Sequence, residues 1–123
     1  MEFNFDNDRP IYIQLINFLK LYIVSGKIQL GERLPSVREL AYMASVNPNT
    51  IQKALFELEN DKLIYTERTN GKYVTKDKKI IENFKNELSE NLTLKYIEDM
   101  VNLGISKEEI ISYIKKEVKW WTY

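Results

Sequence analysis

The segment "ASVNPNTIQKAL", residues 44–55, sets a proline between two asparagines at the start of a helical pattern. Apolar residues follow at the three- and four-residue spacing of a helix that buries one side: Ile51, Ala54, Leu55 and Leu58. Proline is favoured at the first helical position, where no backbone N–H is needed, and asparagine is favoured as the N-cap before it. We therefore predict a helix that begins at Pro48, with Asn47 as its N-cap.

The residues ahead of this helix predict another one, joined to it by a short turn. "SVRE", residues 36–39, has the pattern of a capping box, so a helix should begin after Ser36 and run to about residue 44. Its apolar side would consist of Val37, Leu40, Ala41 and Ala44. Arg38 and Tyr42 then point the opposite way. Only residues 45–47 separate the two helices, which is typical of a helix-turn-helix unit.

Two flanking patterns complete this domain. Residues 10–25 carry apolar residues at helical spacing, with Pro10 in the first turn and Gly26 as a stop. "LIYTER" and "KYVTK" are rich in β-branched and aromatic residues and are separated by "TNG", which indicates a hairpin with an Asn-Gly turn. Three helices followed by a hairpin is the order of a winged helix-turn-helix domain, in which the hairpin is the wing.

The chain becomes helical again after Asp77. One apolar pattern ends at Gly104, and another helix follows the capping box "SKEE", residues 106–109. Two amphipathic helices alone cannot bury their apolar faces, so they either fold back on the N-terminal domain or meet the same helices of another chain. We predict the second arrangement, with a dimer interface formed by Ile81, Phe84, Leu88, Ile97, Val101, Ile110, Ile114, Val118 and Trp121.

The predicted fold is mostly α with a small β-hairpin. It consists of a winged helix-turn-helix domain at residues 1–76 and a short two-helix dimerisation region at residues 77–123. The 44% hydrophobic and 29% charged residues are typical of soluble globular chains. The apolar run at residues 11–24 is interrupted by polar side chains, and the acidic segment before it does not resemble a signal peptide. We therefore expect a cytoplasmic protein with no membrane partner.

Cysteine and histidine are both absent from the sequence. Their absence excludes disulfides, thiolate nucleophiles, imidazole bases and the usual zinc ligands. The carboxylates fall mostly on exposed helix faces, and no phosphate-binding glycine loop is present. We therefore expect a protein that is not an enzyme and that needs no metal or cofactor.

The first turns of the helix that begins at Pro48 are the strongest candidate site. Asn49, Thr50, Gln52 and Lys53 project outward there, which is either an ordinary solvated face or the position from which a helix-turn-helix reads base edges. Asparagine and glutamine can bind adenine through two hydrogen bonds, and lysine can reach guanine or a phosphate. We favour DNA reading, because these residue types suit that position.

Other candidates surround this helix. Arg38 could pair with Glu39 or hold a phosphate or guanine, and we favour the contact with DNA. The full set of predicted DNA-binding residues is Arg33, Ser36, Arg38, Asn47, Pro48, Asn49, Thr50, Gln52, Lys53, Asn70, Gly71, Lys72 and Tyr73. The charge supports this set weakly: the chain has 18 basic and 18 acidic residues, and residues 33–76 carry seven basic residues against five acidic ones.

We expect the aromatic residues outside this set to have packing roles rather than to bind a ligand or a base. Phe56 falls on the outward side of its helix, and we expect it to contact the wing or the C-terminal helices rather than to stack on a base. Trp120, Trp121 and Tyr123 are expected to pack an interface rather than to line a ligand pocket.

Residues 31–76, "GERLPSVRELAYMASVNPNTIQKALFELENDKLIYTERTNGKYVTK", resemble the DNA-binding domain of GntR-type bacterial transcription regulators. The resemblance runs through the Gly-x-x-Leu-Pro-Ser-x-Arg-Glu-Leu-Ala segment, the Val-Asn-Pro-Asn-Thr helix start and the Ala-x-x-x-Leu-Glu core. With "NDRPIYIQL" at residues 7–15, it covers nearly all of the first 76 residues. The Asn-Pro-Asn-Thr start and the short helical tail resemble the YtrA subfamily, whose members dimerise through two C-terminal helices and often repress transporter operons.

This resemblance implies roles for particular residues. Arg38 corresponds to the family's helix-two arginine, and Gly71 corresponds to the wing tip. The DNA-contacting start of the recognition helix corresponds to Pro48, Asn49, Thr50 and Gln52. The sequence departs from the family at Lys62, where glycine is usual, and in the wing, which lacks a Gly-x-Gly pattern. The family's larger effector-binding or aminotransferase-like domains are missing, so the sequence identifies no effector.

These observations support a homodimeric repressor that binds a pseudo-palindromic DNA operator. The alternative is a winged-helix module that docks a protein and does not bind DNA, for which a net charge of zero would be natural. Tight, salt-sensitive binding to DNA would distinguish the first hypothesis from the second.

Overall fold

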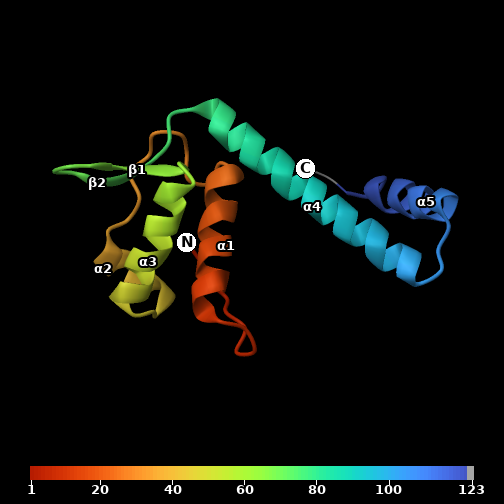
Figure 1. Ribbon diagram of the computed structural model, residues 1–123, viewed down its shortest axis with the longest axis horizontal. Coiled ribbons are helices and arrows are strands. Elements are labelled where there is room, and N and C mark those ends of the chain that lie inside the picture. Colours follow the sequence, from red (N-terminus) through yellow and green to blue (C-terminus); the bar gives the residue numbers. More distant parts are fainter. Residues whose placement is uncertain (122–123) are drawn as a thin grey trace. The chain divides into compact units, whose positions relative to one another are not determined.

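The computed structural model describes residues 1–121 and confirms the predicted order of elements and the mostly helical fold class. The elements are α1 Ile11–Val24, α2 Val37–Ala44, α3 Pro48–Asn60, β1 Ile64–Glu67, β2 Gly71–Val74, α4 Lys78–Asn102 and α5 Lys107–Val118 (Figure 1). They form two compact units, Met1–Lys85 and a second that begins at Asn86. Helix α4 belongs to both units, because its first turns pack on the N-terminal core.

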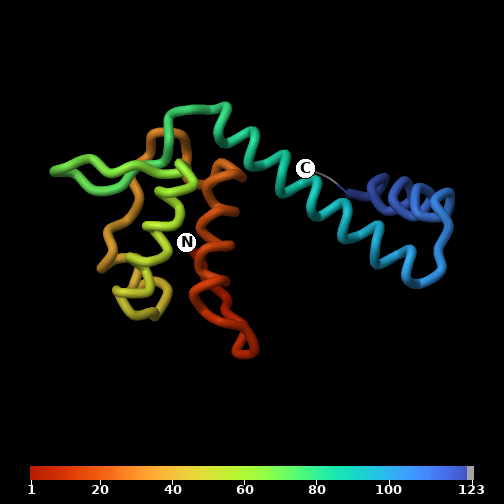
Figure 2. The backbone as a smooth tube through the Cα atoms, in the orientation of Figure 1, coloured from red at the N-terminus to blue at the C-terminus, as the bar shows by residue number. Residues whose placement is uncertain are grey.

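The first three helices enclose the core of the N-terminal unit. Helices α1 and α3 run side by side, and α2 packs against α3 (Figure 2). All four residues of the predicted inward stripe of α3 are buried: Ile51, Ala54, Leu55 and Leu58. They meet buried residues of α1 and α2, including Leu15, Leu19 and Leu40. The side that α3 turns away from the core is therefore set by helical geometry.

The segment before α1 folds onto that helix. Pro10 is the N-cap of α1 rather than a residue of its first turn, because the helix begins at Ile11. The buried side chain of Gln14 accepts a hydrogen bond from the Asp6 backbone N–H at 2.7 Å and donates to the Asp6 carbonyl at 2.9 Å. An aromatic cluster of Phe3, Phe5, Phe18 and Tyr22 covers the same helix. The acidic leader is thus part of the folded unit.

The hairpin is antiparallel, and its register differs from the predicted Asn-Gly turn. Ile64 pairs with Val74 and Glu67 pairs with Gly71, so the connecting loop is residues 68–70 and Gly71 already belongs to β2. The left-handed φ of +107° at Gly71 makes this chain reversal possible. Residues 32–34 add to the outer edge of β2, where the Leu34 N–H donates to the Lys72 carbonyl at 2.8 Å.

A left-handed residue that is not glycine follows both α2 and α3: Ser45 directly after α2, and Lys62 after the C-cap Asp61 of α3. Ser45 has φ of 52°, and Lys62 has φ of 64°. The Leu63 N–H donates to the Leu58 carbonyl, and the Lys62 N–H donates to the Glu59 carbonyl, both at 3.0 Å. This pair of bonds is a Schellman motif, whose left-handed position usually carries glycine. Lys62 therefore holds a conformation that costs an L-residue free energy.

The C-terminal unit buries little apolar surface within one chain. Helix α4 has no buried residue, and α5, which begins with the predicted Ser106–Glu109 capping box, buries only Ile110. After α4 the chain reverses direction and α5 runs back (Figure 2). No helix among residues 1–121 is both long and apolar enough to span a membrane.

The structure divides the predicted dimerisation residues into three groups. Ile81 and Phe84 are half-buried against the core of the N-terminal unit, because the first turns of α4 cover it. Ile110 is buried inside the C-terminal unit. Leu88 is half-buried, and the others are exposed in the single chain: Ile97, Val101, Ile114, Val118 and Trp121. Trp120 is exposed as well, and Tyr123 lies outside the described residues.

We predict that Lys62→Gly stabilises the protein by about 0.5–1 kcal/mol, because glycine adopts the left-handed conformation without a Cβ clash. Urea unfolding followed by circular dichroism measures the change. Lys62→Ala is the matched control, since it removes the same charged side chain but keeps Cβ. Equal stability of the two variants would contradict the explanation by backbone strain.

Candidate nucleic-acid interface

The start of α3 is built as the sequence predicts. The side-chain oxygen of Asn47 accepts a hydrogen bond from the Asn49 backbone N–H at 2.8 Å, and Pro48 occupies the first helical position. No acidic residue lies in the first turn, so the positive partial charge of the helix N-terminus is not neutralised locally. Asn49 and Gln52 are exposed, and within residues 1–121 neither side-chain amide has a hydrogen-bond partner. Thr50 is half-buried beside them.

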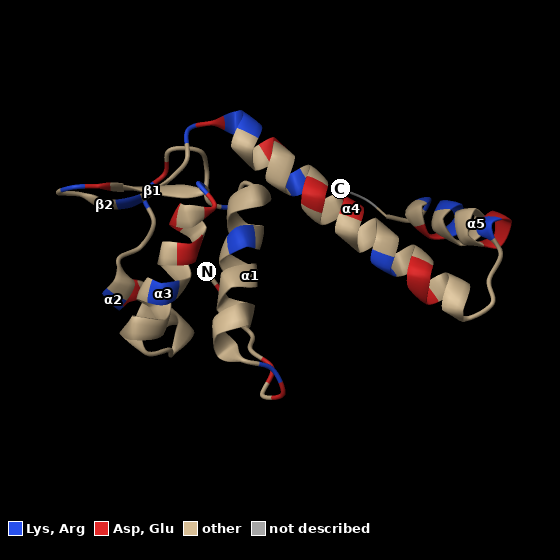
Figure 3. Cartoon of the chain, viewed as in Figure 1, with Lys and Arg blue, Asp and Glu red and all other residues tan. Residues whose placement is uncertain are grey.

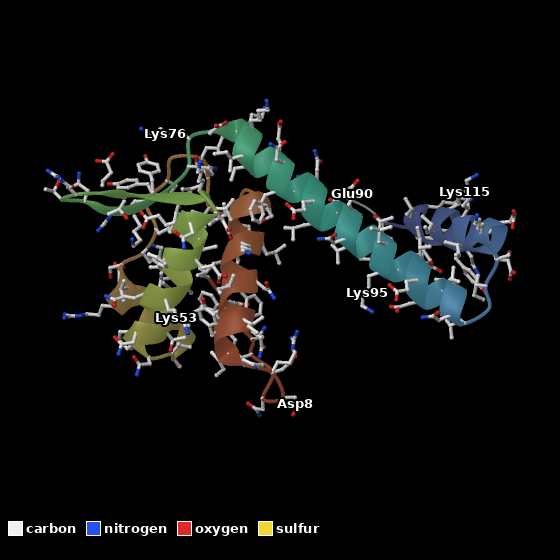
Figure 4. All side chains as sticks on the ribbon, in the orientation of Figure 1. Asp8, Lys53, Lys76, Glu90, Lys95 and Lys115 are labelled. Atoms are coloured by element: carbon white, nitrogen blue, oxygen red, sulfur yellow. The ribbon has the colours of Figure 1, made fainter. Side chains whose placement is uncertain are left out.

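Lys53 differs from these neighbours because the chain itself holds its side chain. Its ammonium lies 4.7 Å from the centroid of the Tyr12 ring, on the flank of α3 that faces α1 (Figure 4). The Tyr12 hydroxyl donates to Glu57 Oε2 at 3.0 Å. Partial burial, the hydrogen bond and the negative charge of Glu57 all raise the pKa of Tyr12 above its ordinary value. No local sequence pattern predicts this group, since Tyr12 and Glu57 are 45 residues apart.

Arg38 projects from α2 without a partner. It is exposed, and no ion pair among residues 1–121 includes it. The predicted alternative, a pair with Glu39, is not formed because Glu39 closes the capping box: the Ser36 N–H donates to its carboxylate, and its own N–H donates to Ser36 Oγ, both at 3.1 Å. The guanidinium of Arg38 is thus available to a ligand.

The capping box also shifts the acidity of Glu39. The hydrogen bond from the Ser36 backbone lowers the pKa of Glu39 below its usual value, and the Ser36 hydroxyl and the charge of Arg33 act in the same direction. Partial desolvation opposes them. Ser36 therefore acts here as a helix cap, with its side chain engaged at the start of α2.

The wing brings together three of the predicted residues. Arg33 Nε donates to the Asn70 carbonyl at 2.6 Å, and its guanidinium lies against Gly71. A Cβ at Gly71 would stand 3.3 Å from Arg33 Nε, a tight contact that the Arg33 side chain would have to relieve by a small shift, and the φ of +107° itself favours glycine. Tyr73 stacks on Tyr65 across the hairpin, with ring centroids 5.7 Å apart.

Lys72 is bound within the chain. Its ammonium donates to Thr66 Oγ1 at 2.8 Å and forms an ion pair with Glu59 Oε2 at 3.5 Å. Thr66 in turn donates to the carboxylate of Glu59. These three side chains, which we call the wing staple, tie both strands to the end of α3. Lys72 is predicted from the sequence to bind DNA, and the staple is not predicted, because its members come from three separate elements.

The acidic residues of α3 lie in its C-terminal half, as the red bands in Figure 3 show. Both are engaged sideways: Glu57 with Tyr12 of α1, and Glu59 with the hairpin. From Asn49 to Phe56 the helix carries no carboxylate, and the two that follow are both engaged with neighbouring elements. The outward face of α3 is compatible with a polyanion.

The fold and this surface define a class of protein. Two helices separated by residues 45–47 are followed by a hairpin, and the second helix presents an uncovered, acid-free first turn. In a helix-turn-helix, this turn is the one that enters the major groove. The chain is therefore a winged helix-turn-helix protein of the DNA-binding class.

Comparison with known proteins agrees with this class. Residues 11–74 match the family described as "Bacterial regulatory proteins, gntR family". The chain is 37% identical over 109 residues to the HTH-type transcriptional repressor YtrA of Bacillus subtilis (strain 168), covering 87% of this chain and 83% of that protein. The chain belongs to the GntR family, and the predicted resemblance to YtrA-type regulators is confirmed.

Solved structures extend the comparison. A GntR family transcriptional regulator from Listeria monocytogenes is 47% identical, with a TM-score of 0.86 over 91% of this chain and 98% of its own. The AraR DNA-binding domain in complex with operator ORE1 is 26% identical, with a TM-score of 0.53 over 61% of this chain and 94% of its own. The chain is thus a DNA-binding transcriptional regulator of the GntR family.

We predict that Glu39→Gln lowers the melting temperature near neutral pH and that this difference disappears in acid. Because the pKa of Glu39 is lowered on folding, its stabilisation is complete above the ordinary carboxyl pKa and is lost as the pH falls through the lowered value. Thermal unfolding of both proteins between about pH 7 and pH 3 measures the effect. In a Ser36→Ala background the pH-dependent difference should shrink but persist, because the hydroxyl is lost while the backbone N–H of residue 36 still donates to the carboxylate. An undiminished difference would exclude a contribution from the Ser36 hydroxyl.

Proposed function

We propose that this protein is a homodimeric repressor that binds a pseudo-palindromic operator through two copies of α3 and blocks the promoter. The exposed, acid-free start of α3 carries the proposal, because it offers free amide side chains where a helix-turn-helix meets base edges. Two such helices would lie about one DNA turn (~34 Å) apart. Acting on DNA, the protein would work in the cytoplasm.

The structure suggests a division of roles among the candidate residues. Asn49, Thr50 and Gln52 would read bases, and the unpaired Arg38 would hold a phosphate. Ser36, Asn47 and Pro48 would fix the helix starts that present these side chains. Arg33, Asn70 and Gly71 would reach the backbone or minor groove from the wing, with Tyr73 beside them.

Lys53 and Lys72 would contribute less to DNA contact than the residues above, because both have partners within the chain. Lys53 lies over Tyr12, so it would reach DNA only at the edge of the α3 face. Lys72 would steady the wing through the staple rather than bind a phosphate, since its ammonium already has two partners.

The homodimer rests on the C-terminal unit. Helices α4 and α5 bury only Ile110, and they leave apolar residues such as Ile97, Val101 and Ile114 exposed. A second copy can cover these faces with matching apolar residues, as symmetric interfaces do. The domain boundary we propose for this arrangement is the one between residues 76 and 77, with the first turns of α4 linking the two parts.

Repression is the sense of regulation that the similarity to YtrA favours, because that relative is named a repressor. By the same resemblance, the regulated genes would form a transporter operon. The proposal does not include a small-molecule effector.

Binding to DNA tests the proposal directly. We expect the purified protein to prefer its own upstream intergenic DNA over a scrambled duplex by ~10³ or more, with an affinity that falls steeply as salt rises. Fluorescence anisotropy at two salt concentrations gives both quantities. Equal, weak binding to the two duplexes would instead support the protein-docking module.

Arg38→Ala should weaken binding to specific and scrambled DNA alike and reduce the slope of log affinity against log salt by about one, if the residue neutralises one phosphate. Arg9→Ala is the control, because it removes an equal charge that is paired with Asp6 ahead of α1. A slope that is unchanged in the Arg38 variant would remove Arg38 from this role.

Ile114→Glu should convert the dimer into a monomer, since it places a charge in the apolar face of α5 that we assign to the interface. Sedimentation equilibrium measures the mass. Ser112→Glu adds the same charge on the exposed polar side of α5 and should leave the dimer intact. Equal masses for the two variants would contradict the assigned face.

A further inference from the structure

Phe56 is an exposed aromatic residue in the middle of α3. Its side chain is 64% exposed, whereas the other large apolar side chains of the helix are buried. From the sequence we expect a contact with the wing or the C-terminal helices; among residues 1–121, however, Phe56 is not one of the side chains packed on the core, and its ring has no aromatic partner. A large apolar side chain that is exposed to solvent on α3 therefore requires a different explanation.

Helical geometry puts Phe56 in line with the candidate base-reading residues. Phe56 follows Asn49 by seven residues, or nearly two full turns, so the two side chains leave the helix in almost the same direction. Gln52 and Lys53 flank this line one turn earlier. Phe56 therefore continues the face that begins with the exposed amides.

The surroundings of Phe56 allow DNA to approach it. Glu57 and Glu59 are its acidic neighbours on the helix, and both turn sideways to Tyr12 and to the wing staple. Their carboxylates are thus directed along the flanks of α3 rather than from its outward face. A phosphate backbone that meets Asn49 and Gln52 is not repelled by an unpaired acid beside Phe56.

We infer that Phe56 packs against the 5-methyl group of a thymine in the major groove and so contributes to operator specificity. The inference rests on the proposed operator binding. The thymine methyl is the apolar group that base edges present in this groove, and a phenyl ring can neither donate to a base nor pair with a phosphate. Asn49 and Phe56 are about 10 Å apart along the helix axis, which corresponds to about three base pairs.

Replacing single thymines of the operator by deoxyuridine tests this contact, because the change removes only the methyl group. When the replaced thymine is the one that Phe56 contacts in one half-site, wild-type affinity should fall about fourfold, which is the effect of one buried methyl-sized group. Phe56→Ala should bind the unmodified operator more weakly and be indifferent to that same replacement. Phe56→Leu, which keeps an apolar side chain, should stay sensitive to it.

The controls separate this inference from the proposed function. Leu21→Ala removes a similarly exposed apolar side chain, 59% exposed, from α1 and should bind like the wild type. If wild type does not prefer its operator, both proposals fail together. If it does, but no deoxyuridine affects it or Phe56→Ala responds equally, only the Phe56 contact is overturned. A Phe56→Ala protein of halved mass would likewise overturn it and assign the ring to a protein interface.

Discussion

The burial of one stripe of α3 is the constraint on which the rest of the structure depends. Ile51, Ala54, Leu55 and Leu58 are almost fully enclosed by α1, α2 and the hairpin. Once these four residues face inward, the helical repeat fixes the direction of every other side chain of α3. The exposed amides, the line to Phe56 and the sideways positions of both glutamates all follow. The candidate site is therefore a consequence of the core.

Contacts between elements then restrict the two parts that flank this helix. Arg33 joins the segment before α2 to the wing, and the staple of Glu59, Thr66 and Lys72 joins the wing to α3. Individual exposed ion pairs contribute little free energy. Here Glu59 and Lys72 are partly buried and share hydrogen bonds with Thr66, so their main effect is to hold the hairpin in one orientation beside α3.

Much of the fold could be predicted because its signals are local. Both capping boxes, the proline at the first position of α3 and the four-residue stripe depend on neighbours within one or two turns. The contacts that change the reading of the site join distant residues: Lys53 with Tyr12, Lys72 with Glu59, and Ile81 with the N-terminal core. No spacing rule brings such residues together, so the sequence does not show that Lys53 and Lys72 already have partners within the chain.

The wing staple also affects the electrostatics of α3. Glu59 carries a negative charge on α3, close to the surface that would face a phosphate backbone, and the ammonium that balances it comes from the hairpin. Lys72 of the hairpin thus balances the charge of Glu59. A chain whose hairpin detached would lose more than an extra contact surface, because its helix would meet DNA with an unscreened carboxylate. The packing of the wing on α3 and the binding of DNA by α3 would therefore be thermodynamically coupled.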